Sequence, residues 1–205
     1  MIRKFAISAA QMLGIVTLLA LANVANAQES EAVVIAEMQH GNPDAKVTVI
    51  EYASFTCPHC ANFHKDQYQE LKTNYIDTGM INFVYREVYF DRFGLWSSMV
   101  ARCDETKFFG ISDLLYKGQS EWTKGTPAEI ADNLRKIGRV AGLSEDQLTA
   151  CLSDADKATG LYGWYKENAE TDGITSTPSF IINGEKSPNL SYAEFAAVLD
   201  EKLAE

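Results

Sequence analysis

Residues 47–60, with the sequence VTVIEYASFTCPHC, decide the fold of this chain. Residues 47–55 are rich in β-branched and aromatic side chains and nearly continuous in apolar character, which is typical of a strand buried on both faces. Pro58 suits the first turn of a helix, where its fixed φ fits and its missing N–H is not needed. Cys57 and Cys60 therefore lie where a buried strand passes into a helix.

The segment after this junction completes a strand–helix–strand unit. Apolar and aromatic side chains recur at helical spacing after Pro58 until Gly79, a residue that commonly ends helices. Residues 81–90, with the sequence INFVYREVYF, predict a second strand. A unit of this kind normally has parallel strands and a right-handed crossover.

Residues 93–171 carry helical signals. The run Thr126-Pro127-Ala128-Glu129 combines a capping box with proline at the first helical position, and Gly142 is placed to end that helix. The run Ser144-Glu145-Asp146-Gln147 is a second capping box. We expect about four helices here, which form a separate helical layer.

The chain then returns to β structure. Residues 179–182 predict a strand that enters a tight hairpin turn at Asn183-Gly184, because this dipeptide tolerates the positive φ values such turns need. The run Ser191-Tyr192-Ala193-Glu194 is a third capping box, and it opens a final helix with one apolar face.

Residues 1–27 have the three parts of an export signal. Arg3 and Lys4 give a positive start, residues 14–22 are apolar, and Ala25-Asn26-Ala27 is a small-x-small cleavage site. We expect cleavage before Gln28 and a periplasmic location; an uncleaved membrane anchor is the alternative. The following segment, residues 28–46, is polar and contains the turn cluster Gly41-Asn42-Pro43-Asp44.

The charge of the chain disfavours two classes of partner. Its net charge is −10, and the balance becomes −12 without residues 1–27, which hold two basic and no acidic side chains. Nucleic acids and anionic membrane surfaces attract clustered Lys and Arg, so neither is an expected partner.

Cys57 and Cys60 are the decisive chemical feature. A thiolate at a helix N-terminus faces free backbone N–H groups, and a CxxC motif at a strand-to-helix junction indicates thiol–disulfide chemistry. A metal site is the alternative, because His64 follows Cys60 by one helical turn. A structural zinc site normally needs four ligands, however, and only His40 and His59 remain.

On these residues the sequence resembles the thioredoxin-like superfamily, and most closely the DsbA family of periplasmic disulfide oxidases. Residues 55–60, FTCPHC, match the active-site motif of that family, and residues 175–180, TSTPSF, match its cis-proline loop. The resemblance implies a thioredoxin-like α/β fold with a helical insertion. The corresponding boundaries are residues 47–92 and 172–205 for the thioredoxin-like domain and 93–171 for the insertion, after the 28–46 segment.

The resemblance also implies how the site works. Cys57 would be the exposed nucleophile, Cys60 the resolving thiol, and Thr177 with a cis Pro178 would bind the backbone of the substrate. The substrates would be unfolded or partly folded exported proteins with free thiols. A quinone-linked membrane protein would reoxidise the dithiol, and we expect a monomer without cofactor.

Two further residues are candidates for tuning the dithiol. Glu51 stands in an otherwise apolar strand, six residues before Cys57. Related folds carry a buried acid at this offset, so Glu51 could be a buried proton relay. A solvent-facing Glu51 is the alternative. His59 lies between the cysteines and can give the Cys57 thiolate a hydrogen bond or positive charge. A solvent-facing His59 is the alternative.

Cys103 and Cys151 are the remaining pair if the CPHC motif cycles. Some DsbA relatives carry a second disulfide in the helical region, so we expect a structural disulfide between these two residues; two free thiols are the alternative.

The function expected from all this is a thiol–disulfide oxidoreductase that introduces disulfides into exported proteins. A reductase or isomerase on the same fold, and a metal-binding or chaperone module, remain as alternatives.

Overall fold

The computed structural model describes residues 33–205. The export signal expected in residues 1–27 and the beginning of the 28–46 segment lie outside this part of the chain. Across residues 33–205, no helix combines the length and the apolar character that a membrane span requires.

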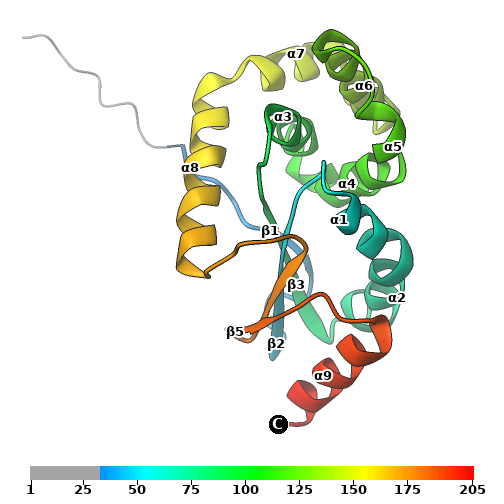
Figure 1. Cartoon of the computed structure of the whole chain (residues 1–205), viewed down its shortest axis with the longest axis vertical. Coiled ribbons are helices and arrows are strands. Elements are labelled where there is room, and N and C mark those ends of the chain that lie inside the picture. Colours follow the sequence, from blue (N-terminus) through cyan, green and yellow to red (C-terminus); the bar gives the residue numbers. More distant parts are fainter. Residues whose placement is uncertain (1–32) are drawn as a thin grey trace, which may run out of the picture. The chain divides into compact units, whose positions relative to one another are not determined.

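A five-stranded sheet forms the centre of the described part, in the order β1-β3-β2-β4-β5 (Figure 1). The strands are β1 (Met38–Gly41), β2 (Val47–Ala53), β3 (Ile81–Glu87), β4 (Ser179–Ile182) and β5 (Glu185–Ser187). β2 and β3 are parallel, as the strand–helix–strand unit predicts, whereas every other neighbouring pair is antiparallel. Both predicted strands of this unit end earlier than expected.

Strand β1 was not expected from the sequence. It lies inside the 28–46 segment and pairs with β3, with Met38 opposite Tyr85 and Gly41 opposite Asn82. Its polar residues Gln39 and His40 give no apolar alternation, and the strand is held at the edge of the sheet by its backbone pairing.

The helical segment between β2 and β3 is interrupted by wider turns. It comprises α1 (Pro58–Phe63), a π-helical turn (His64–Tyr68), α2 (Gln69–Leu71) and a second π-helical turn (Lys72–Ile76). Gly79 follows with a φ of +73°, in agreement with its predicted role as a helix terminator. Single π turns inside helices are rare and frequently accompany functional sites.

The region between β3 and β4 holds six α-helices rather than about four. They are α3 (Arg92–Ala101), α4 (Phe108–Lys117), α5 (Gln119–Trp122), α6 (Pro127–Val140), α7 (Glu145–Ser153) and α8 (Ala155–Thr171), with a 3₁₀ turn at Glu105–Lys107. The capping boxes at Thr126 and Ser144 are both formed, and Gly142 ends α6 with a φ of +81°. One of the missed elements is α5, which is only one turn long and has no side-chain cap.

The C-terminal elements follow the prediction closely. Asn183 and Gly184 have φ values of +46° and +84°, which identifies the tight turn that joins β4 to β5. The capping box of Ser191 and Glu194 then opens α9 (Tyr192–Ala204).

The two faces of the sheet have different coverings (Figure 1). Val47, Val49 and Glu51 of β2 point to the face covered by α1, α2 and α9, where the largest apolar cluster lies. Tyr52 points to the opposite face and packs with Tyr165 of α8. In Figure 1, α3–α7 gather at the end of the sheet where β2 leads into α1. Glu51 therefore lies in the core, on the face beneath the helix that carries the cysteines.

Candidate active site

The loop between β2 and α1 positions Cys57 as the residue that precedes the helix. Cys57 has an extended backbone conformation at the N-cap of α1, and Pro58 occupies the first helical position. The backbone N–H of Cys57 donates to the carbonyl oxygen of Ser54 at 3.0 Å. This turn brings the motif above the end of the sheet.

Gln119 of α5 fixes the same loop from the helical layer. Its buried Nε2 donates to the carbonyl oxygens of Phe55 at 2.7 Å and Cys57 at 3.0 Å. The carbonyl oxygen of Cys57 also accepts the backbone N–H of Ala61 at 3.2 Å, so Gln119 adds a second hydrogen bond there. This role could not be predicted from the sequence, because a single glutamine far along the chain carries no local pattern.

The two thiols of the motif are free and differ in burial. Cys57 exposes 7 % of its surface, whereas Cys60 is fully buried. Of the two sulfurs, only that of Cys57 can contact a sulfur atom of another protein. Cys57 is less exposed than expected, and its role as the nucleophile stays a prediction.

The surroundings of Cys57 stabilise its thiolate. A hydrogen bond from the Cys60 thiol makes the largest contribution, and together with the Thr177 side chain and the backbone N–H groups of Cys60 and His59 it lowers the pKa of Cys57 to about 5. Burial opposes this change. A thiol with such a pKa is mostly ionised at neutral pH, and it is a good leaving group in disulfide exchange.

The surroundings of Cys60 act in the opposite direction. Burial raises the pKa of Cys60 far above that of a free thiol, and the hydrogen bond to Cys57 and the negative charge of Glu51 raise it further. Cys60 therefore holds its proton until a base removes it.

The loop before β4 closes over the sulfurs. The Thr177-Pro178 peptide bond is cis, as the resemblance implied. Cys57 Sγ lies 3.5 Å from the carbonyl oxygen of Thr177, to which its thiol form donates, so this loop contacts the dithiol directly. The position is suitable for the expected contact with a substrate backbone, which stays a prediction.

Glu51 is fully buried, so the alternative of a solvent-facing residue is wrong. Its Oε2 lies 3.2 Å from Nε2 of His64, which is itself only 5 % exposed. His64 comes from the π-helical turn after α1, and its ring stacks on Tyr116 of α4 at a centroid distance of 4.0 Å. From the sequence His64 was considered only as a possible metal ligand; its partner in the structure lies 13 positions away.

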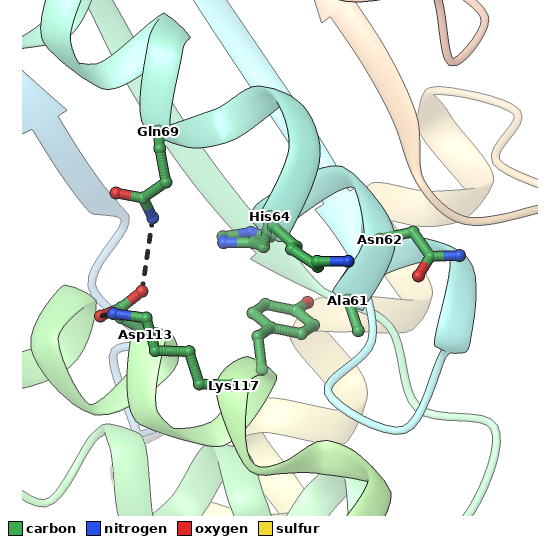
Figure 2. A pocket seen from close by; sticks show the side chains of 8 residues that line it. Ala61, Asn62, His64, Gln69, Asp113 and Lys117 are labelled. Atoms are coloured by element: carbon green, nitrogen blue, oxygen red, sulfur yellow. Dashed lines mark hydrogen bonds and ion pairs between the residues drawn. The ribbon is translucent and has the colours of Figure 1, made fainter.

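His64 also lines a pocket of about 270 Å³. Figure 2 shows its ring between residues of the helical segment after Cys60, which include Asn62 and Gln69, and residues of α4, which include Asp113 and Lys117. The pocket opens the surroundings of the Glu51–His64 pair towards solvent.

His59 was expected to act on Cys57 through its side chain, but it acts through its backbone. The residue is exposed, and it acts on Cys57 through its backbone N–H. Within residues 33–205, its imidazole makes no hydrogen bond to either sulfur. An effect of the ring on Cys57 would therefore have to come from its charge alone.

The remaining cysteines are joined. Cys103 and Cys151 form a disulfide across 48 positions of the chain, in agreement with the pairing that the resemblance implied. The residues that the structure describes contain no group of three or more His, Cys, Asp or Glu side chains placed to hold a metal ion. His64 pairs with Glu51 and not with the cysteines.

The comparison with protein families agrees with this geometry. The model of the family described as thioredoxin matches residues 34–201. The chain belongs to the thioredoxin family. In this thioredoxin-family chain the helical insertion lies between β3 and β4, as expected for a DsbA-like fold.

Two relatives and one solved structure illustrate the similarity. The chain is 36 % identical over 177 residues to a Rickettsia bellii protein assigned as a protein-disulfide oxidoreductase, covering 82 % of this chain and 65 % of that protein. It is 25 % identical over 174 residues to disulfide bond formation protein D of Bacillus subtilis, covering 80 % of this chain and 75 % of that protein. The crystal structure of Wolbachia pipientis alpha-DsbA1 superposes with a TM-score of 0.75 at 25 % identity, covering 84 % of this chain and 93 % of that structure. The resemblance to the DsbA family and the predicted fold are thereby confirmed.

Proposed function

We propose that this chain is a protein-disulfide oxidoreductase that acts as a dithiol oxidase on exported proteins. The observation that carries the proposal is the opposite effect of the site on its two sulfurs. Cys57 is a stabilised thiolate that keeps 7 % of its surface exposed, with its pKa lowered to about 5, and Cys60 is a fully buried, protonated thiol. Stabilising the reduced form in this way makes the corresponding disulfide a stronger oxidant, as it does in DsbA itself.

The reaction follows from this difference. A substrate thiolate attacks Cys57 of the Cys57–Cys60 disulfide, the bond between the two sulfurs breaks, and Cys60 leaves with the electron pair and takes up a proton. A second substrate thiolate attacks the substrate sulfur of the mixed disulfide, and Cys57 leaves as its stable thiolate. The substrate has gained a disulfide, and the motif is reduced.

The other residues of the site have supporting roles in this proposal. Thr177 and Pro178 bind the substrate backbone beside Cys57, and Glu51 exchanges a proton with Cys60. Cys103 and Cys151 hold the helical layer together. A membrane protein linked to quinones reoxidises the motif, and the chain acts in the periplasm after removal of residues 1–27.

The test is oxidation of a reduced, unfolded protein by the purified, oxidised chain. We expect faster disulfide formation than without the chain, and no acceleration by Cys57→Ser. Unchanged activity in Cys57→Ser would disprove the role of the motif.

A reduction potential measured against glutathione separates the oxidase from the reductase. We expect a value well above the roughly −270 mV of thioredoxin. A value near or below that of thioredoxin would favour the reductase.

A further inference from the structure

The Glu51–His64 pair has an unpartnered atom at each end. Within residues 33–205, neither Oε1 of Glu51 nor Nδ1 of His64 has a hydrogen-bond partner, although both atoms are buried. The other two atoms of the pair, Oε2 and Nε2, lie 3.2 Å apart. A buried polar atom without a partner is costly, and where one persists it commonly has a functional reason.

The two ends of the pair face different chemistry. On one side, the Glu51 carboxylate is close enough to Cys60 for its charge to raise the pKa of that thiol. On the other side, His64 lines the pocket of about 270 Å³ in Figure 2, which is far larger than the roughly 10–15 Å³ that one water molecule needs. The pair thus lies between a buried thiol and a solvent-accessible pocket.

We propose that His64 is a positioning and proton-exchange residue that connects Glu51, and through it Cys60, with water in this pocket. The inference rests on the proposed function, since it concerns a step of that reaction. His64 acts through Glu51 and does not touch the sulfurs.

The step can be written for reoxidation, when Cys57 is in a mixed disulfide with its oxidant. The Cys60 thiol gives its proton to Oε1 of Glu51, and the Cys60 thiolate attacks the Cys57 sulfur. The Cys57–Cys60 bond forms, and the oxidant sulfur leaves with the electron pair of the broken bond. At the same time, the imidazolium of His64 releases the proton on its buried Nδ1, and this proton reaches the water of the pocket that the side chain lines.

This exchange keeps the pair neutral throughout. Before the step it is a carboxylate with an imidazolium, and afterwards it is a carboxylic acid with a neutral imidazole. The Nε2–H of His64 donates to Oε2 of Glu51 in both states, so no proton has to cross that hydrogen bond. In the other half of the cycle the same protons move in reverse, and no net charge enters the core.

Other ionisable groups face His64 from the neighbouring elements. Glu51 of β2 is its hydrogen-bond partner, and three tyrosines lie around the ring: Tyr68, Tyr85 and Tyr116. Burial raises the pKa of all three phenols, so they stay neutral over the pH range in which the proposed exchange takes place. The charged groups at the pocket are Lys65, Asp113 and Lys117.

His64→Gln separates proton exchange from support of the structure. The glutamine amide can donate to Glu51 from the position of Nε2, but it cannot bind and release a proton at Nδ1. His40→Gln is the matched control, because His40 lies on β1 outside the pocket and its Nδ1 contacts the Tyr68 hydroxyl at 3.2 Å. Thermal unfolding of each variant checks that the fold is kept.

The measurement is release of glutathione from the Cys57–glutathione mixed disulfide, formed with oxidised glutathione and followed from pH 5 to 8. We expect His64→Gln to slow release at least about tenfold at pH 7 and to flatten the pH profile, since acid–base assistance typically contributes 10²–10⁴-fold. His40→Gln should match the unchanged chain. Added imidazole should restore much of the rate in His64→Ala, whose truncated side chain leaves space beside the pocket.

The possible outcomes distinguish the inference from the proposed function. If His64→Gln releases glutathione at the rate and with the pH profile of the unchanged chain, the role of His64 is disproved and the dithiol function stands. If the unchanged chain itself fails to release glutathione, the proposed function fails and the role of His64 fails with it.

Discussion

The chain holds two cysteine pairs in contrasting surroundings. Cys57 and Cys60 are three positions apart, at the junction of β2 and α1, whereas Cys103 and Cys151 join parts of the helical layer that are 48 positions apart. The second pair is the more exposed one, since both of its residues are partly exposed and Cys57 exposes only 7 %. Exposure alone would therefore favour Cys103 and Cys151 over the pair that we propose as reactive.

What distinguishes the Cys57–Cys60 pair is its polar surroundings. One of its sulfurs is stabilised as a thiolate by a neighbouring thiol and by backbone N–H groups, while burial and a carboxylate keep the other protonated. The comparison teaches that an exchangeable disulfide needs two unequal sulfurs. A structural disulfide needs only two positions of the backbone held at the right separation, such as the turn after α3 and the helix α7.

The strongest test of this comparison is selective reduction. In a glutathione buffer we expect Cys57 and Cys60 to become reduced and alkylated while Cys103 and Cys151 stay joined, because structural disulfides resist reduction more than catalytic ones. Peptide mapping after alkylation reports all four residues in one experiment. Alkylation of Cys103 and Cys151 in the native, air-oxidised protein would contradict the pairing.

The second test concerns the inequality within the Cys57–Cys60 pair. Iodoacetamide should alkylate Cys57 of the reduced protein with a midpoint near pH 5, and Cys60 should stay unmodified throughout the range in which the fold is stable. Because the folded pKa of Cys57 lies below that of an unfolded thiol, its thiolate stabilises the reduced fold above the unfolded pKa. This contribution is lost as the pH falls through about 5. Equal alkylation of both residues would remove the inequality.

The third test removes the structural disulfide. Cys103→Ala combined with Cys151→Ala should lower the free energy of unfolding by about 4 kcal/mol on the chain-entropy model for a loop of this length. Urea unfolding measures this loss. Substrate oxidation at a temperature where the variant is folded should change little, and complete loss of oxidation there would mean that the two pairs are coupled.

The smallest expected effect is that of His59→Ser. The serine keeps the backbone N–H through which residue 59 acts on Cys57, and only the exposed imidazole is lost. We expect the pKa of Cys57 to rise by about one unit or less, which corresponds to about 1.4 kcal/mol, or about 30 mV for the two-electron couple. Alkylation across pH and a glutathione titration measure the two quantities. A much larger rise would show that the charge of the ring matters more than the backbone.

The features that the sequence predicted depend on neighbouring residues. The apolar run of β2, the proline after Cys57, the three capping boxes and the Asn183-Gly184 turn are each determined within a few positions, and the structure contains all of them. The burial of Glu51 could be inferred because its phase along β2 places it with Val47 and Val49.

The features that the sequence did not predict depend on contacts between distant residues. β1 is recognisable only through its pairing with β3, and His64 acquires its role only from the position of Glu51. The π-helical turn that carries His64 has no established local signal. Gln119 and the loop it fixes belong to different layers of the fold, and no pattern along the chain joins them.

The hydrogen bonds of Gln119 have a consequence for how the molecule moves. One side chain from α5 holds the carbonyls on either side of Thr56, so a displacement of α5 pulls on the backbone that positions the Cys57 sulfur. The coupling works in both directions, because a displacement of Cys57 by a bound substrate moves α5 through the same two hydrogen bonds. The two hydrogen bonds of Gln119 thus attach the loop before α1 to the helical insertion, and they limit how far Cys57 can move.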